Sequence, residues 1–273
     1  MAEGLTEGTP LADPVQAEPQ APALRTAAPI RRRFVVVYVL LAIALISGVT
    51  SLVIFASRSI DPGPSWSAWK PSGGGLGAAK QIAEHVGPKY RLPDGNQLVD
   101  VIARGASVSA GGQSIPIPLI ALRGPKGKIS QDSVVQVGSS DTYTFSLCGL
   151  GDSCSIATGK PSAERATLVR REILELALYT FKYVKGVKHI VAFMPPPKGT
   201  PPSYVVYLQK DDLKGQLGVP LTQTLKPKAP LPNQITATER SRIDGVTEPR
   251  IYKFGLSQTQ QGDAVLVLQP LQA

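Results

Sequence analysis

Residues 163–184, AERATLVRREILELALYTFKYV, are the stretch of the chain that decides its fold. Apolar side chains recur along it at helical spacing, which places Ala166, Ile173 and Val184 on one face. Ser162 precedes the stretch with a side chain suited to an N-cap, and Gly186 follows it as a typical end signal. We therefore expect a helix from Ala163 to Val184 that lies across a sheet.

Charged side chains of this segment are expected to face solvent. Arg171 and Glu175 fall in a narrow polar stripe opposite the apolar face. Glu172 and Glu175 are interpreted as exposed ion-pair partners of neighbouring arginines, with an acid pair as the alternative. Arg170 lies at the edge of the apolar face, where a charge needs a partner, so we expect it to contact a buried carboxylate or an anionic ligand.

Short strands are indicated on both sides of this helix. They cover residues 97–103, 114–123, 133–137, 142–147, 189–194 and 203–209, and a short helix covers residues 76–86. We expect an α+β domain over residues 76–225, in which a mixed or antiparallel sheet packs on the central long helix.

The last part of the chain, residues 226–273, is predicted to be a Pro-rich linker and a β-hairpin. Its strands cover residues 250–256 and 264–268. Because two strands alone are only marginally stable in water, we expect this pair to join the main sheet or the sheet of a partner.

An apolar stretch near the N-terminus, FVVVYVLLAIALISGVTSLVIF from Phe34 to Phe55, contains no charged residue. As a helix it is about 33 Å long, enough to span the hydrocarbon core of a membrane. A buried core helix fits less well because the polar stripe is short, and a cleavable signal peptide fits less well because a polar leader precedes the stretch. We predict an uncleaved transmembrane anchor.

Positive charge predicts the orientation of this anchor. Arg31, Arg32 and Arg33 precede it directly, whereas Arg58 alone follows it closely, and positive residues near a span tend to stay cytoplasmic. The prediction is a single-pass plasma-membrane protein with a cytoplasmic N-terminus and an extracytoplasmic C-terminal domain.

The segments that flank the anchor are polar or rich in proline and glycine. Residues 1–33 are predicted to form a disordered cytoplasmic tail, and residues 56–75 a Pro/Gly-rich stalk. Within that stalk, Trp66 and Trp69 suit either the membrane interface or the base of the folded domain.

The formal net charge of +9 resides in the part of the chain beyond the anchor, because the acidic and basic residues of the N-terminal tail cancel. An outward-facing basic domain attracts anionic lipid headgroups, phosphate-bearing wall polymers or acidic protein partners. The alternative is an even spread of charge that only aids solubility. No nucleic-acid partner is expected.

Two cysteines, Cys148 and Cys154, flank a short segment rich in glycine. In an oxidising compartment, an even pair at this spacing indicates a structural disulfide. A redox pair is the alternative, although the spacing is not that of a C-x-x-C motif and no histidine is close in sequence.

The sequence predicts no catalytic, cofactor-binding or metal-binding residues. Residues 73–78 match the pattern G-x-G-x-x-A, but no strand precedes them to aim a dinucleotide-binding turn. His85 and His189 are the two histidines, and neither has an acidic residue or cysteine at ligand spacing. Both are expected to serve in packing or at the surface.

Four short motifs carry a resemblance to a known group of proteins. They are Tyr90-Arg91-Leu92-Pro93, Cys148-Gly149-Leu150-Gly151, Gly159-Lys160-Pro161 and Arg170-Arg171-Glu172. At these motifs the chain resembles uncharacterised single-span envelope proteins of high-GC Gram-positive bacteria, from the anchor to Leu225. The resemblance implies a plasma-membrane location and implies no activity and no site.

Three functional hypotheses follow. The first is a non-enzymatic envelope protein that presents a basic domain to a protein partner or a wall component, as a subunit of an envelope assembly. The second is an envelope enzyme acting on wall glycan or lipid, with Asp and Glu side chains as acid and base. The third is thiol–disulfide exchange through Cys148 and Cys154.

Overall fold

The structure of the protein is a computed structural model that describes residues 35–45, 65–110, 113–124, 129–130, 133–138 and 140–271. The chain divides into two units, Met1–Gly63 and Pro64–Ala273. Each unit is described by itself.

In the first unit, residues 35–45 form a helix with exposed side chains. The rest of the predicted anchor, Phe34 and residues 46–55, lies outside the described residues, as do the predicted tail and residues 56–64 of the predicted stalk. Over the described ranges, no helix is both long enough and apolar enough to cross a membrane.

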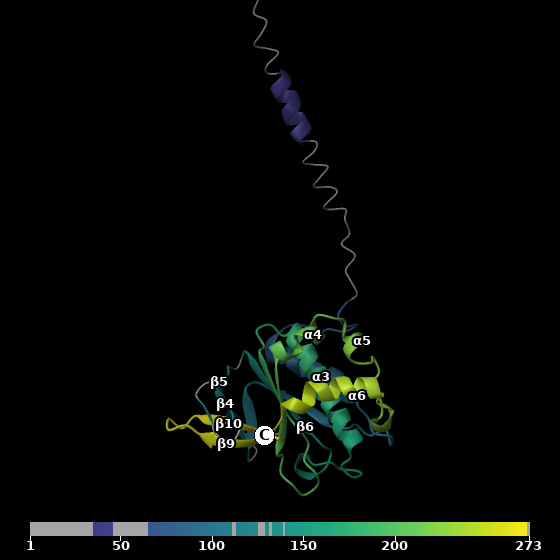
Figure 1. Cartoon of the computed structure of the whole chain (residues 1–273), viewed down its shortest axis with the longest axis vertical. Coiled ribbons are helices and arrows are strands. Elements are labelled where there is room, and N and C mark those ends of the chain that lie inside the picture. Colours follow the sequence, from purple (N-terminus) through teal and green to yellow (C-terminus); the bar gives the residue numbers. More distant parts are fainter. Residues whose placement is uncertain are drawn as a thin grey trace, which may run out of the picture. The chain divides into compact units, whose positions relative to one another are not determined.

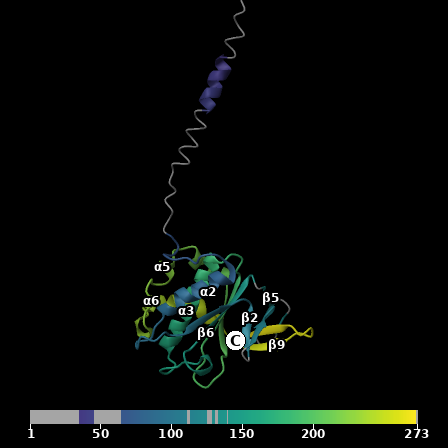
Figure 2. The ribbon, with the colours of Figure 1, turned by 180° about the vertical axis from the view of Figure 1, so that it is seen from behind.

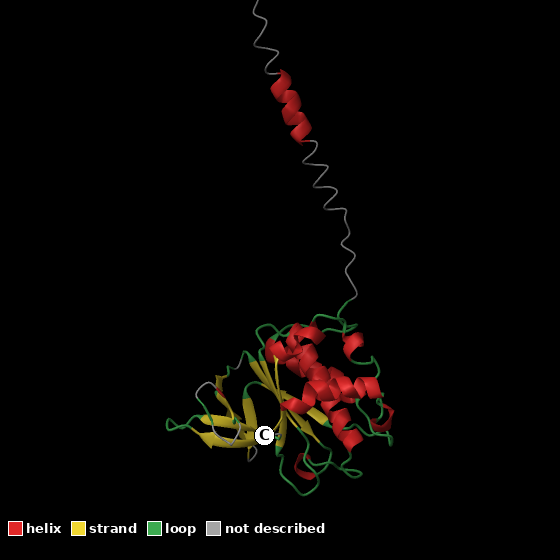
Figure 3. Cartoon of the chain, in the orientation of Figure 1, coloured by secondary structure: helices red, strands yellow, loops and turns green. Residues whose placement is uncertain are grey.

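The second unit is an α+β domain built on an eight-stranded mixed sheet with helices packed against it (Figures 1 and 3). The strand order is β1-β6-β7-β8-β9-β10-β4-β5. The strands of this sheet are β1 (Asp100–Arg104), β4 (Leu119–Leu122), β5 (Val134–Gln136), β6 (Thr142–Cys148), β7 (His189–Phe193), β8 (Tyr204–Gln209), β9 (Ile251–Gln258) and β10 (Ala264–Pro270). The helices are α2 (Gly75–Val86), α3 (Ala163–Tyr183), α4 (Lys214–Leu217), α5 (Leu221–Thr224) and α6 (Ala237–Thr247).

The central helix α3 confirms the prediction made from its periodicity. Its N-cap is Ser162, whose hydroxyl oxygen accepts a hydrogen bond from the Arg165 N–H at 3.2 Å. The helix connects β6 to β7, which pair in parallel, and parallel neighbours need such a crossover. Figure 2 shows α2 beside α3 on the same side of the sheet.

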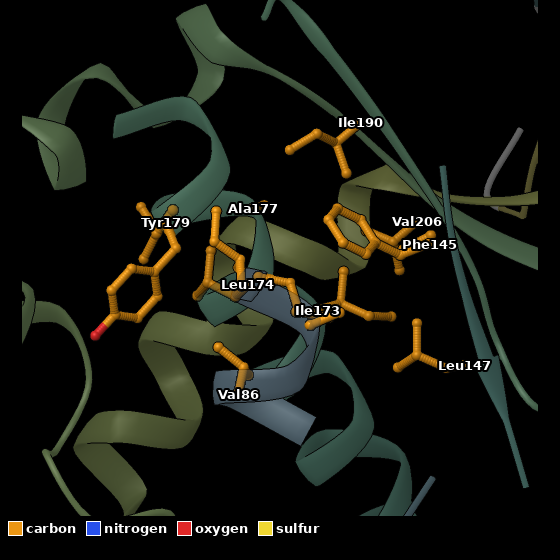
Figure 4. Packing of buried hydrophobic residues seen from close by; sticks show 14 of the residues in the cluster. Val86, Phe145, Leu147, Ile173, Leu174, Ala177, Tyr179, Ile190 and Val206 are labelled. Carbon is orange, nitrogen blue, oxygen red and sulfur yellow. The ribbon is translucent and has the colours of Figure 1, made fainter. Parts of the chain in front are cut away.

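The main core lies between these helices and the sheet. Ile173 of α3 lies beside Phe145 of β6, and Leu174 of the same helix, Val206 of β8 and Val86 of α2 belong to the same buried cluster (Figure 4). All five side chains are fully buried. Burying a side chain such as Leu174 contributes about 1.5–3 kcal/mol relative to leaving it exposed.

A smaller core lies on the opposite face of the sheet, where Val191, Phe193 and Val205 alternate along the chain with the residues that face α3. A hairpin of β2 (Ser107–Ala110) and β3 (Gln113–Pro116) packs there through Val108. The strand expected over residues 114–123 is in fact β3 and β4. Prolines at positions 116 and 118 separate the two because proline cannot donate to a ladder.

The terminal strands join the main sheet, the first of the two alternatives left open by the sequence. β10 pairs antiparallel with β9 and parallel with β4, so it lies inside the sheet rather than at an edge. Helix α6 precedes this pair, within the segment predicted to be a linker. It packs on α3.

Trp66 and Trp69 belong to this second unit, which supports the second of their two proposed roles. Both pack against the main core, Trp69 stacks on His85 with ring centroids 3.8 Å apart, and the Trp66 carbonyl accepts the Leu221 N–H at 2.8 Å. Residues 65–74, placed in the stalk by the sequence, are therefore tied to the domain.

Candidate functional site

A cleft of about 560 Å³ opens on the sheet face that points away from α3. Ser146 and Phe193 reach it, whereas Phe145 and Ala192, one residue earlier in the same strands, are buried toward α3. Strand alternation therefore separates the cleft from the main core.

Two walls of the cleft come from distant parts of the sequence. Ile102 of β1 and Val108 of β2 belong to one wall, and Phe254 and Leu256 of β9 belong to the other. Phe254 packs edge to face on Phe193, with ring centroids 5.0 Å apart. Leu256 is 44% exposed, so the β9 wall presents an apolar side chain that is only partly covered.

The Cys148–Cys154 disulfide forms one end of the cleft and confirms the sequence prediction. Its loop is held by the Gly149 N–H, which donates to the Cys154 carbonyl at 2.9 Å. A side chain at Gly149 is excluded because a Cβ there would lie 2.1 Å from the Ser155 carbonyl oxygen. The glycine-rich loop thus folds back tightly and places both half-buried cysteines against the cleft.

The charge of the cleft comes from Arg104 at the end of β1. Its Nη1 donates to the Ser146 hydroxyl at 3.2 Å, and it forms no ion pair with any residue that the structure describes. The turn between β1 and β2 is fixed by the Thr144 hydroxyl, which donates to the carbonyls of Gly105 and Ser107 at 3.1 and 2.8 Å. Arg104 is therefore positioned with free N–H donors toward the cleft.

No Asp, Glu or His is among the described residues that line this cleft. General acid–base chemistry needs a titratable group within hydrogen-bond reach of the reacting atom. The cleft has the composition of a binding site, with apolar walls and one cation.

Comparison with known proteins gives no relative of this chain. No protein-family model, no curated protein and no solved structure matches it.

A second cluster of charges lies inside the domain, where α3, α6 and the segment after α2 meet. Arg171 is fully buried, and its Nε donates to Glu239 Oε1 at 2.8 Å. Its remaining donors reach the Lys226 carbonyl at 2.7 Å and the Tyr90 hydroxyl at 2.5 Å. Tyr90 in turn donates to Glu175 at 2.6 Å.

This cluster corrects the prediction of a solvent-facing stripe on α3. Arg171 and Glu175 are buried because α6 and the η1 turn (Gly87–Lys89) with Tyr90 cover that face. Lys89 adds an ion pair to Glu175 at 3.1 Å. The periodicity placed the charges on the correct face, but it did not reveal the helix that buries them.

Glu172 was also predicted to be exposed, and this prediction is wrong. The residue is completely buried, and neither carboxylate oxygen has a hydrogen-bond partner among the described residues. Burial raises the pKa of Glu172 well above its ordinary value, and the charge of Glu175 raises it further. Glu172 is not among the residues that line the cleft.

Arg170, the candidate anion or ion-pair residue, lies away from the cleft on the side of α3 that meets α6. Its Nη2 contacts Asp244 at 2.7 Å and its Nη1 contacts Glu248 at 2.9 Å. The guanidinium is nearly buried, while the two carboxylates are partly exposed. These ion pairs join α3 to the C-terminal end of α6.

A shallower hollow of about 510 Å³ at the start of α3 is lined by two carboxylates, Asp94 and Glu164. A hydrogen bond from its own backbone N–H and another from the Ser162 hydroxyl lower the pKa of Glu164. A general acid needs a raised pKa, so the lowered pKa of Glu164 is not that expected of a general acid. Glu164 instead complements the positive end of the helix.

Metal coordination is not supported by the described residues, in which no group of three or more His, Cys, Asp and Glu side chains is arranged to hold an ion. Of the two histidines, His85 stacks on Trp69 and His189 hydrogen-bonds through Nδ1 to the Tyr207 hydroxyl at 2.9 Å. Burial lowers the pKa of both imidazoles.

The structure thus brings the predicted cysteines to the cleft and leaves Arg170 elsewhere. Sequence reasoning missed Arg104, Phe193 and Leu256 as cleft residues. No local motif marks them, since they meet only when β1, β7 and β9 take their places in one sheet.

Proposed function

We propose that this chain is a non-enzymatic, membrane-anchored envelope protein whose extracytoplasmic domain binds a protein partner or an anionic envelope component in the cleft beside β9. The observation that supports it is the cleft, in which apolar walls surround an arginine without an ion-pair partner among the described residues. Binding sites of this kind are mostly apolar, with a few polar groups that fix orientation.

The location is proposed from the sequence and is compatible with the disulfide. The apolar stretch from Phe34 to Phe55, preceded by three arginines, predicts an anchor that leaves the domain outside the cytoplasm. Disulfides persist in such oxidising compartments.

Cysteine labelling in intact cells tests this topology. A membrane-impermeant maleimide is expected to label Ser257→Cys, which lies on exposed β9, and to leave Thr6→Cys unlabelled until the cells are lysed. Labelling of Thr6→Cys alone in intact cells would show the opposite orientation. If both variants are labelled to the same extent, or if neither is labelled, the anchor is refuted.

Site-specific photocrosslinking tests binding in the cleft. A benzoylphenylalanine at Leu256 is expected to give a discrete adduct in intact cells, and the same group at exposed Gln223 serves as the matched control. The adduct must weaken when Arg104→Gln is introduced. An adduct that forms equally at both positions, or that ignores Arg104→Gln, contradicts the proposal.

Thiol–disulfide exchange is the second candidate because Cys148 and Cys154 both line the cleft. A half-buried disulfide at a binding surface is accessible to a partner thiolate. If exchange is the function, one of the two single variants, Cys148→Ser or Cys154→Ser, should trap a mixed disulfide with a partner. The other single variant should trap none. Recovery of partner binding by the double Cys→Ser variant would refute exchange and leave the binding role.

A further inference from the structure

Only part of β9 is paired on both sides. β8 pairs with Ile251–Lys253, and the Phe254 N–H donates to the Ser203 carbonyl at 3.1 Å. Among the residues that the structure describes, Gly255 to Gln258 pair with β10 alone, because β8 begins at Tyr204. In Figure 1 this end of the β9–β10 hairpin projects from the sheet.

The free edge presents the backbone groups of Leu256 and Gln258. Residues of an antiparallel strand direct their N–H and C=O groups to alternate neighbours. Phe254 directs its N–H toward the β8 side, so Leu256 and Gln258, at two and four residues further, direct theirs to the same side. Gly255 and Ser257 direct theirs to β10.

This edge runs along the cleft. The side chains of Phe254 and Leu256 form the β9 wall, and Arg104 lies among the residues of the cleft on β1. Natural edge strands are usually blocked by charges, prolines or bulges. Gly255-Leu256-Ser257-Gln258 contains no charged residue and no proline, so the edge is open to pairing.

We propose that this open half of β9 binds an extended segment of a partner protein, which adds as a strand beside Leu256 and Gln258, places an apolar side chain in the cleft and directs a carboxylate to Arg104. The inference rests on the proposed binding function and specifies its ligand. Strand addition of this kind derives affinity from main-chain hydrogen bonds and specificity from side-chain pockets.

Charge favours an acidic partner segment over the other occupants. The unit Pro64–Ala273 contains 24 Lys and Arg against 15 Asp and Glu. A second copy that paired through its own β9, IYKFGLSQ, offers Arg104 no carboxylate from that strand. A fatty acid supplies a carboxylate but no backbone donors and acceptors for the strand edge.

The test uses the full chain in detergent micelles and a library of displayed heptapeptides with one fixed aspartate. Selected peptides are expected to bind, and Arg104→Gln is expected to weaken them about tenfold or more. Arg123→Gln, which alters an exposed arginine beyond the end of β4, is the matched control and should leave affinity unchanged.

Amide hydrogen exchange on the complex distinguishes this inference from the broader proposal. Bound peptide is expected to slow exchange at Leu256 and Gln258 by about tenfold or more, with no change at Gly255 and Ser257. Arg104-dependent binding without that slowing overturns strand addition and keeps the cleft as a binding site. Failure to recover any Arg104-dependent peptide overturns both.

Two further measurements address the other occupants. Sodium oleate is tested as a competing ligand. If it binds in an Arg104-dependent manner and displaces the peptides without slowing amide exchange at Leu256, the inference is overturned in favour of an acyl ligand. Sedimentation that shows dimers, together with slowed exchange at Leu256 and Gln258 in the absence of peptide, overturns it in favour of a second copy.

Discussion

Replacement of Arg171 by methionine tests the charged cluster that joins α3 to α6. The variant removes the guanidinium and leaves the carboxylates of Glu175 and Glu239 buried, at 5% and 3% exposure. Glu175 keeps its contacts with Lys89 and Tyr90, and Glu239 Oε1 keeps the Lys226 N–H. Removing one partner of a buried ion pair costs about 3–5 kcal/mol, so a similar loss of unfolding free energy is expected.

Equilibrium unfolding by guanidinium chloride measures this loss. Trp66 and Trp69, the two tryptophans of the chain, both pack against the core and report unfolding by fluorescence. The control is Lys214→Met, which removes the ion pair of Lys214 with Asp211, two side chains that are 74% and 80% exposed. This control should lose about 1 kcal/mol or less.

The difference in unfolding free energy between Arg171→Met and Lys214→Met tests whether the buried cluster contributes more than a surface ion pair. If Arg171→Met loses no more free energy than Lys214→Met, the buried cluster contributes as little as a surface pair and the reasoning is refuted. The double variant Arg171→Met/Glu239→Gln should be more stable than the sum of the single losses implies, by about 0.5–3 kcal/mol. Additive losses would mean that Arg171 and Glu239 act independently.

Three further predictions concern single features of the domain. Burial raises the pKa of Glu172 in the folded protein above its unfolded value near 4.5. As the pH rises above 4.5, the unfolding free energy should therefore fall by about 1.4 kcal/mol per pH unit. This fall should end at the pH at which the carboxyl of the folded protein ionises. Glu172→Gln should abolish this fall in a pH series of unfolding curves, whereas Glu84→Gln, on the exposed side of α2, should retain it. Leu174→Ala leaves a cavity in the main core and should lower the unfolding free energy by about 2–5 kcal/mol by the same assay, and a loss below 1 kcal/mol would contradict the tight packing of the main core around α3. Reduction of Cys148–Cys154 should lower it by about 2 kcal/mol, and alkylation before reduction should add no mass to the native chain.

Local signals made α3 predictable. Its apolar repeat, the Ser162 cap and the following glycine all act within a few turns, so they are visible in the sequence alone. The same is true of β7 and β8, whose apolar runs are bounded by prolines and turns.

Burial of the polar side of α3 was not predictable from that segment. It depends on α6, a helix with few apolar residues that was not expected and whose main sequence marks are the Thr236 cap and Glu239. The carboxylate of Glu239 accepts a hydrogen bond from Arg171, which lies 68 residues earlier in the sequence, and such a contact leaves no local pattern.

The residues of the candidate site likewise include some that the sequence predicts and others that it does not. The disulfide was predictable because two cysteines in one short, flexible loop have few alternatives. Arg104 and Leu256 were not, because they meet only through the strand order, in which the C-terminal β9 and β10 separate β8 from β4. The open edge of β9 arises from the difference in length between β8 and β9, which only the paired structure defines.

The position of β10 sets the timing of folding during synthesis. β4 lies at residues 119–122, yet its parallel neighbour is the strand at residues 264–270, so β4 and β5 have no partner in the main sheet until that late segment is available. Contacts between such distant segments form slowly, because a long loop must close first. If the domain is exported as an unfolded chain, its sheet is completed only after β10 has crossed the membrane, and until then the β4 edge is exposed to chaperones, proteases and neighbouring chains.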